Sequence, residues 1–286
     1  MKWFKTRSYY LFIPSVLFLL IPLYGLGSAI AQSVRDNGAF TFQYYTSLFE
    51  SERFLTSAGF SLQVSLVSSL LSLIIGLWIT RACYPLLEKY TPRLIVWLPM
   101  LFPHFVWGYM VILLLSESGV LSQWMQMTGL IGVPADFPVW TRDPYGIGIT
   151  LTYVWKEVPF VILMLLPVYA SIKPEFYDLV QSLGGGAWER FKTVEWPHLL
   201  PVVVESFLII FAFTLSAYEV PALLGTTYPE MLSVLSYDWF YGSVWEDRPL
   251  AFAAMSLMSV FLLMITCVAY LYLNRKRWRA MRGRIE

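Results

Sequence analysis

The chain has 286 residues, of which 57% are hydrophobic and only 14% are charged, whereas a soluble domain carries roughly 25% charged residues. This composition, with a net charge of +1, excludes a disordered chain and a basic nucleic-acid binder and disfavours a soluble enzyme. Two cysteines, Cys83 and Cys267, are too few for a disulfide framework or a cysteine zinc site. The composition therefore predicts a protein that lies in a lipid membrane.

Six apolar runs are each long enough to cross a membrane, which takes about 20 residues in a helix. Of the 20 basic and 19 acidic residues, only Lys156, Glu157, Glu205 and Glu219 fall inside these runs. Lipid offers no hydrogen bonds to the backbone, so each run is predicted to be a helix. The runs are residues 9–31, 60–80, 94–115, 146–170, 199–221 and 250–273.

Lysine and arginine are distributed unevenly between the connecting segments. Fifteen lie in the N-terminal flank, in 81–93, in 171–198 and in 274–286, whereas the other three loops hold four. Because basic residues stay on the cytoplasmic side, both termini and the 171–198 loop are predicted to be cytoplasmic. The first apolar run is too long for a signal peptide, so we expect it to be an uncleaved span.

The cytoplasmic loop 171–198 carries the clearest pattern. Pro174 suits the first turn of a helix, and four apolar residues then follow at the spacing of one helical face. Glycines 184–186 are predicted to end this helix, and Pro197 marks the entry to the fifth span. Such a helix could dock in the groove of a partner or lie on the membrane surface. The four residues of the predicted face are Phe176, Leu179, Val180 and Leu183.

The same loop contains a spaced motif. Asp178-Leu179-Val180 is followed after three residues by Gly184, and nine residues later by Val194 to Pro197. This pattern resembles the EAA loop of ABC-transporter permeases of the type I importer family, which reads E-A-A, three residues, Gly, nine residues, I-x-L-P. The differences are Asp for Glu, Leu-Val for Ala-Ala, Val for Ile and Trp for Leu. Residues 219–221 and 224–225 resemble the polyamine-, iron- and thiamine-type branch of this family.

The resemblance implies an all-α membrane protein with six transmembrane helices and a cytoplasmic coupling helix between the fourth and fifth. It divides the chain into a first helix with its outer loop (1–55), a permease core of five helices (56–273) and a basic tail (274–286). The residues that it assigns to ATPase coupling are Asp178, Leu179, Val180, Leu183, Gly184, Gly185, Trp188, Phe191, Val194 and Pro197.

The resemblance also implies partners. A dimer of ABC ATPases would bind ATP and Mg²⁺ and power alternating access. A second permease chain, identical or related, would complete the pathway. A periplasmic or lipid-anchored binding protein would deliver the solute at the bacterial inner membrane. The solute classes left open are a polyamine, an iron complex, thiamine, sulfate or another small solute, and an excess of acidic residues in the outer loops slightly favours a cation.

Charges inside spans are functional candidates because lipid penalises them. Lys156, Glu157, Glu205 and Glu219 are therefore candidates for the solute pathway or a gate, with packing inside the bundle as the alternative. Lys156 and Glu157 are adjacent in sequence and should face different neighbours. Glu219 is expected near the outer end of the fifth span, with Pro221 ending or bending that helix. His104 is interpreted as a packing residue.

The sequence lacks the motifs of an enzyme. It contains no G-x-x-x-x-G-K-[ST] phosphate loop and no H-E-x-x-H zinc motif, so this chain is predicted to bind no cofactor and no metal, and to have no contact with nucleic acid. The alternative function is a secondary transporter driven by an ion gradient, which would use intramembrane carboxylates such as Glu205 and Glu219.

Overall fold

The computed structural model describes residues 12–36 and 38–282, with side chains as far as residue 273. Within these ranges, six helical segments are long and apolar enough to cross a membrane, which confirms the predicted number. The small exception to an all-helical chain is a two-residue ladder between β1 (Arg35–Asp36) and β2 (Ala39–Phe40). The basic N-terminal flank, the first three residues of the 9–31 run and residues 283–286 lie outside the described residues.

The described residues form two compact units. The first contains residues up to Leu55 together with Leu235–Met264, and it includes α2 (Phe12–Ser33) and α3 (Gln43–Glu50). The hydroxyls of Ser33 and Tyr45 lie 2.7 Å apart in this unit. Most apolar side chains of α2 are exposed, as expected for a helix that meets lipid. The predicted division at residues 55 and 273 stays a prediction.

The second unit, Thr56–Val234 with the chain from Ile265 onward, is built around three long helices. These are α4 (Glu52–Leu87), α8 (Ile147–Ser171) and α11 (Trp196–Ser216). At Gly76 the helices α4 and α8 approach so closely that an added Cβ would lie 2.6 Å from Cγ1 of Val161. Small residues permit such contacts between membrane helices. One core cluster joins these helices through Leu73, Val161, Leu165, Tyr169, Ile172, Val194, Leu199 and Ile210.

The third span is not the single helix predicted over 94–115. The predicted run forms α5 (Tyr90–Trp97), the 3-10 turn η1 (Leu98–Leu101) and α6 (His104–Leu115), and the third helical segment long and apolar enough to cross a membrane is His104–Met127. Phe102 is extended because proline disfavours helical backbone in the residue before it, and Pro103 is the N-cap of α6. With 12 residues, α6 is about 18 Å long, less than the roughly 30 Å of a bilayer core.

The fifth span also differs from its predicted bounds of 199–221. Helix α11 ends at Ser216, Ala217 is extended, and α12 (Glu219–Leu224) begins separately. We expected Pro221 to end or bend the fifth span, but the span ends five residues earlier, at Ser216. Pro221 lies in the first turn of α12, where its missing N–H would have had no helical partner. Glu219 consequently belongs to this short helix and not to the membrane-spanning one.

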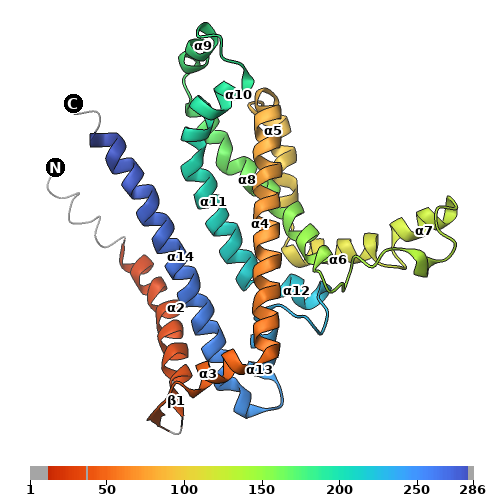
Figure 1. The fold of residues 1–286 in the computed structure, drawn as a ribbon. Coiled ribbons are helices and arrows are strands. Elements are labelled where there is room, and N and C mark those ends of the chain that lie inside the picture. Colours follow the sequence, from red (N-terminus) through yellow and green to blue (C-terminus); the bar gives the residue numbers. More distant parts are fainter. Residues whose placement is uncertain (1–11, 37, 283–286) are drawn as a thin grey trace. The chain divides into compact units, whose positions relative to one another are not determined.

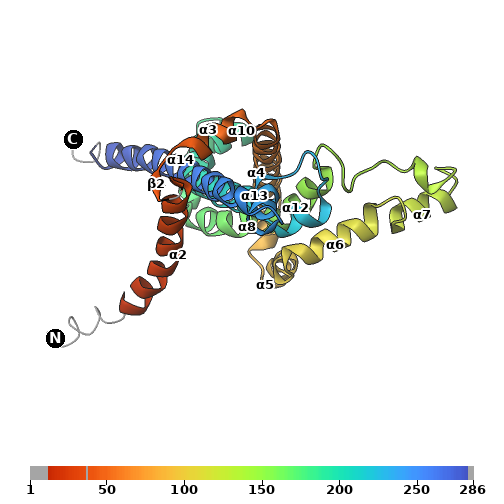
Figure 2. The same ribbon diagram turned by 90° about the horizontal axis from the view of Figure 1, so that it is seen from below.

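The remaining elements are short except for the last helix. They are α7 (Val120–Met127), η2 (Pro134–Asp136), α13 (Leu232–Tyr241) and η4 (Trp245–Asp247), followed by α14 (Arg248–Arg282). Figures 1 and 2 show α6 and α7 extending to one side of α4 and α8. The loop between the fourth and fifth spans forms α9 (Pro174–Ser182), α10 (Ala187–Arg190) and the π-helix η3 (Phe191–Glu195), beyond the ends of α8 and α11 (Figure 1).

Candidate functional site

The connection between α8 and α11 is a helix with a well-defined end. Pro174 occupies the first turn of α9, where the sequence predicted it. The N–H of Gly184 donates to the carbonyl of Gln181 at 3.0 Å, and that of Gly185 to the carbonyl of Val180 at 2.9 Å. These two bonds and the positive φ of +77° at Gly184 form a Schellman motif. The triple glycine therefore ends α9 in a defined geometry.

The apolar residues of α9 are divided between two environments. Phe176, Leu179 and Leu183 are 45%, 58% and 79% exposed. Val180 instead packs against the core cluster that contains Tyr169, so it does not share one exposed face with the other three. Helix α9 thus offers solvent an apolar surface while a different side holds it to the bundle.

The segment after the glycines continues directly into the fifth span. Trp188 is 64% exposed and its ring stacks on Phe191 with 5.7 Å between centroids. Val194 is buried in the core cluster. Asp178 is exposed on α9, and Pro197 is exposed in the first turn of α11. Some of the predicted coupling residues therefore form an exposed apolar surface, namely Leu179, Leu183 and Trp188. Val180 and Val194 instead pack on the core cluster and hold the loop to the bundle.

An ion pair that sequence reasoning did not predict lies beneath this loop. Nε of Arg81 in α4 donates to Oε2 of Glu195 at 3.0 Å, and the hydroxyl of Tyr169 in α8 donates to the same oxygen at 3.1 Å. Glu195 is 7% exposed. In the sequence, Glu195 lies inside the spaced motif, whereas Arg81 was noted only as one of the basic residues of the 81–93 loop. A buried acid in such a motif is the signal that a basic partner must exist.

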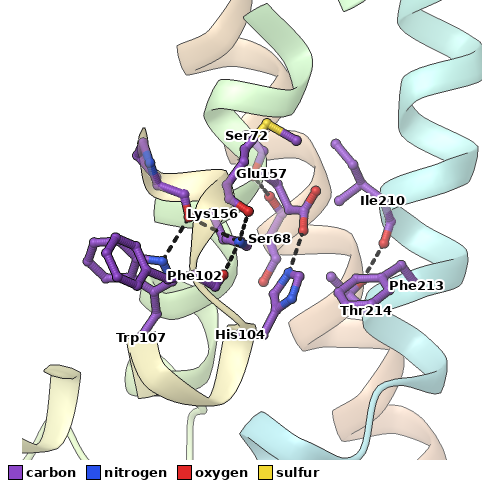
Figure 3. A network of polar contacts seen from close by, with 12 residues as sticks. Ser68, Ser72, Phe102, His104, Trp107, Lys156, Glu157, Ile210, Phe213 and Thr214 are labelled. Carbon is purple, nitrogen blue, oxygen red and sulfur yellow. Dashed lines mark hydrogen bonds and ion pairs between the residues drawn. The ribbon is translucent and has the colours of Figure 1, made fainter. Parts of the chain in front are cut away.

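Lys156 is held by the break in the third span. Its ammonium donates to the carbonyls of Pro99 at 3.0 Å and Met100 at 3.2 Å, and also to that of Phe102 (Figure 3). These carbonyls lose helical partners because the helix stops before Pro103. In the sequence, Pro99 and Pro103 within one apolar run indicated that some backbone carbonyls there would lack helical hydrogen-bond partners.

Glu157 points to a different element, as predicted. Its Oε1 lies 3.1 Å from Nε2 of His104 at the start of α6 (Figure 3). The imidazole also packs on Phe213 of α11, with 4.6 Å between ring centroids. His104 is therefore both a packing residue and the partner of an intramembrane carboxylate.

The four intramembrane candidates are only partly brought together. Tyr153 of α8 is fully buried, and its ring centroid lies 6.4 Å from that of the His104 imidazole. Within the described part of the chain its hydroxyl has no hydrogen-bond partner. Glu219 is exposed in the first turn of α12, and Glu205 is half-buried on α11. Lys156 and Glu157 therefore both contact the third span, whereas Glu205 and Glu219 lie on other elements.

Comparison with known proteins gives a consistent family. A family model described as binding-protein-dependent transport system inner membrane component matches residues 72–279. The inner membrane ABC transporter permease protein YnjC of Escherichia coli K12 is 27% identical over 257 residues, which cover 86% of this chain and 46% of YnjC. The ferric transport system permease protein FbpB of Actinobacillus pleuropneumoniae is 25% identical, over 77% of this chain and 31% of FbpB. The chain therefore spans less than half the length of these relatives.

A solved structure has the same fold. It is a bacterial alginate ABC transporter in complex with an alginate pentasaccharide-bound periplasmic protein, and one of its chains superposes with a TM-score of 0.69. The two chains are 22% identical, and the match covers 92% of each. At this identity the likeness concerns the fold alone.

Proposed function

Because this chain belongs to the family of binding-protein-dependent transport system inner membrane components, we propose that it is the permease subunit of an ATP-driven importer. As a member of that family it is a multi-pass membrane transport subunit. In the proposal, a small solute arrives on a periplasmic or lipid-anchored binding protein and crosses by alternating access. A dimer of separate ATPase subunits, which would bind ATP and Mg²⁺, supplies the energy. A second permease, identical or related, completes the pathway.

The observation that carries this proposal is the exposed apolar surface of α9. Phe176, Leu179 and Leu183 lie on a short helix whose other side is packed against the bundle. Each Å² of such apolar surface that is removed from water contributes about 25 cal/mol of free energy to association with a partner. An amphipathic helix offered in this way suits a groove in a second protein. We therefore propose that α9 is the coupling helix, on the cytoplasmic side with both termini, and that its partner is the ATPase.

A charge introduced on the apolar surface of α9 tests the docking step. Leu179→Asp should abolish co-purification of the ATPase with the full-length chain, because an aspartate would have to be buried in the interface. Ser171→Asp is the matched control, since Ser171 is also exposed but lies at the end of α8. The control should retain the ATPase. ATPase binding that is equal in both variants would contradict the proposal.

A second experiment separates this function from a transporter driven by an ion gradient. Uptake into proteoliposomes should require hydrolysable ATP inside the vesicles and should survive collapse of the ion gradients. Uptake that continues without ATP and stops when the gradients collapse would favour the secondary transporter. Glu157→Gln and Glu219→Gln would then show whether either carboxylate contacts the solute. The relatives carry different solutes, so identification of the binding protein's ligand would name the cargo.

A further inference from the structure

Arg81 connects one membrane-spanning helix to two parts of the α9–α11 loop. Its Nε donates to Oε2 of Glu195 at 3.0 Å, and its Nη2 donates to the carbonyl oxygen of Ala187 at 2.7 Å. The guanidinium carbon also lies 4.8 Å from the ring centroid of Phe191. One side chain of α4 therefore holds both the start of α10 and the π-helix that follows it.

The other end of this link is a buried acid. Glu195 is 7% exposed, and a buried carboxylate is stable only when it is paired and hydrogen-bonded. Arg81 supplies the charge, and the hydroxyl of Tyr169 supplies a second donor at 3.1 Å. Helices α4 and α8 and the π-helix thus meet at one carboxylate oxygen. A π-helical turn inside an α-helix is common at functional sites, and here it contains Glu195.

The link extends to α9. Nη2 of Arg190 in α10 donates to Oε1 of Gln181 in α9 at 2.8 Å. Burial and the charge of Glu195 raise the pKa of Tyr177 in α9, while Arg81 opposes this change. Arg81, Tyr177 and Glu195 also line one hollow of about 390 Å³. The apolar surface of α9 is therefore connected through α10 to the Arg81–Glu195 pair.

We propose that Arg81 is a positioning residue of the transport cycle, which transmits movement of the α9–α10 connection to α4 through Glu195. This inference rests on the proposed function, in which an ATPase moves α9. A charge-assisted contact made by a planar guanidinium is directional, so α4 must follow the loop when the loop moves. A lysine would provide the charge but not the planar two-armed contact.

The experiment uses the full-length chain in complex with its ATPase in liposomes, with ATP and vanadate as the probe. Cys83 and Cys267 are replaced by serine, and spin labels are attached at Leu70 of α4 and Ile209 of α11, which are both about half exposed. The readouts are ATPase co-purification, ATP hydrolysis and the change in label-to-label distance on vanadate trapping. The variants are Arg81→Gln, Arg81→Lys and the exchange Arg81→Glu with Glu195→Arg.

The matched control is Arg93→Gln. Arg93 lies near the same end of the bundle, but its guanidinium donates to the carbonyls of Leu87 and Glu88 at 3.3 and 3.4 Å. We expect this control to behave as the unmodified chain. Arg81→Gln should keep the ATPase bound and hydrolysing but lower, by about fivefold or more, the fraction of complexes that show the label-to-label distance of the vanadate-trapped state, which is the range of an allosteric coupling. Arg81→Lys should be intermediate, and the exchanged pair should recover part of the change.

The outcomes separate the inference from the function on which it rests. A complex that binds no ATPase, or shows no distance change on trapping, before any change at Arg81 overturns the proposed function. A normal distance change in Arg81→Gln overturns the inference alone. Loss of ATPase binding in both Arg81→Gln and Arg81→Lys would also overturn it, because Arg81 would then be needed only to build the docking surface.

Discussion

The three consecutive glycines that end α9 should respond differently to alanine. Gly184 has a φ of +77°, and an added Cβ there meets nothing within 4 Å. Its substitution therefore costs backbone strain alone, about 1–2 kcal/mol for a left-handed residue with a side chain. Such a cost increases local opening about 5- to 30-fold. An added Cβ at Gly185 would lie 2.6 Å from Cγ1 and 3.0 Å from the carbonyl oxygen of Val180, so Gly185→Ala should disrupt the turn more strongly.

Gly186 is the internal control of this series. Its φ is −90°, and the nearest atom to an added Cβ is Oε2 of Glu189 at 3.2 Å, which is the movable end of a side chain. Hydrogen exchange measured by mass spectrometry over residues 174–190 should rise for Gly184→Ala, rise further for Gly185→Ala and stay nearly unchanged for Gly186→Ala. Equal effects at all three positions, or none at Gly184, would refute the assignment of this turn.

Three further substitutions test the packing of the bundle, each by the midpoint of thermal denaturation in detergent. Gly76→Ala should destabilise the protein by about 1–3 kcal/mol through overpacking against Val161. Gly59→Ala on the same helix is the control, because its added Cβ meets no atom within 4 Å and the change should be neutral or slightly stabilising. Equal midpoints for the two variants would contradict the close contact at Gly76. Asp143→Ala should cost about 1–3 kcal/mol, because this buried carboxylate accepts three N–H groups at the start of α8, and Asp143→Asn should lose less. Lys156→Met should lower the midpoint because the carbonyls of Met100 and Phe102 lose this donor, at about 1–3 kcal/mol each, whereas the carbonyl of Pro99 keeps the indole N–H of Trp107. A raised midpoint would show that burial of the ammonium costs more.

The number of the spans followed from composition because lipid imposes a simple rule. A mostly apolar segment that is long enough to cross must be a helix, and the described residues contain six such helical segments. The end of α9 was equally local, since Pro174 and Gly184 act on their own backbone. In both cases the physical constraint operates within one stretch of sequence.

Helix breaks were harder to locate from the sequence. The apolar run 94–115 suggested one helix, but Pro103 and the ammonium of Lys156 together stabilise a break before α6. Pro221 was predicted to end the fifth span, but it lies in the first turn of α12, where a proline is tolerated. Proline shows where a helix can break, whereas the partners of the freed carbonyls decide where it does.

The sequence by itself determined that this chain lies in a membrane, that it has six helical spans and that a glycine-ended helix joins the fourth span to the fifth. Those properties depend on hydrophobicity and on local backbone preferences. Only the tertiary structure decided which charges meet. Arg81 and Glu195 are 114 residues apart, and Lys156 is 54 or more residues from its carbonyl partners. Pairing over such separations depends on how the helices pack, and no local pattern in the sequence records it.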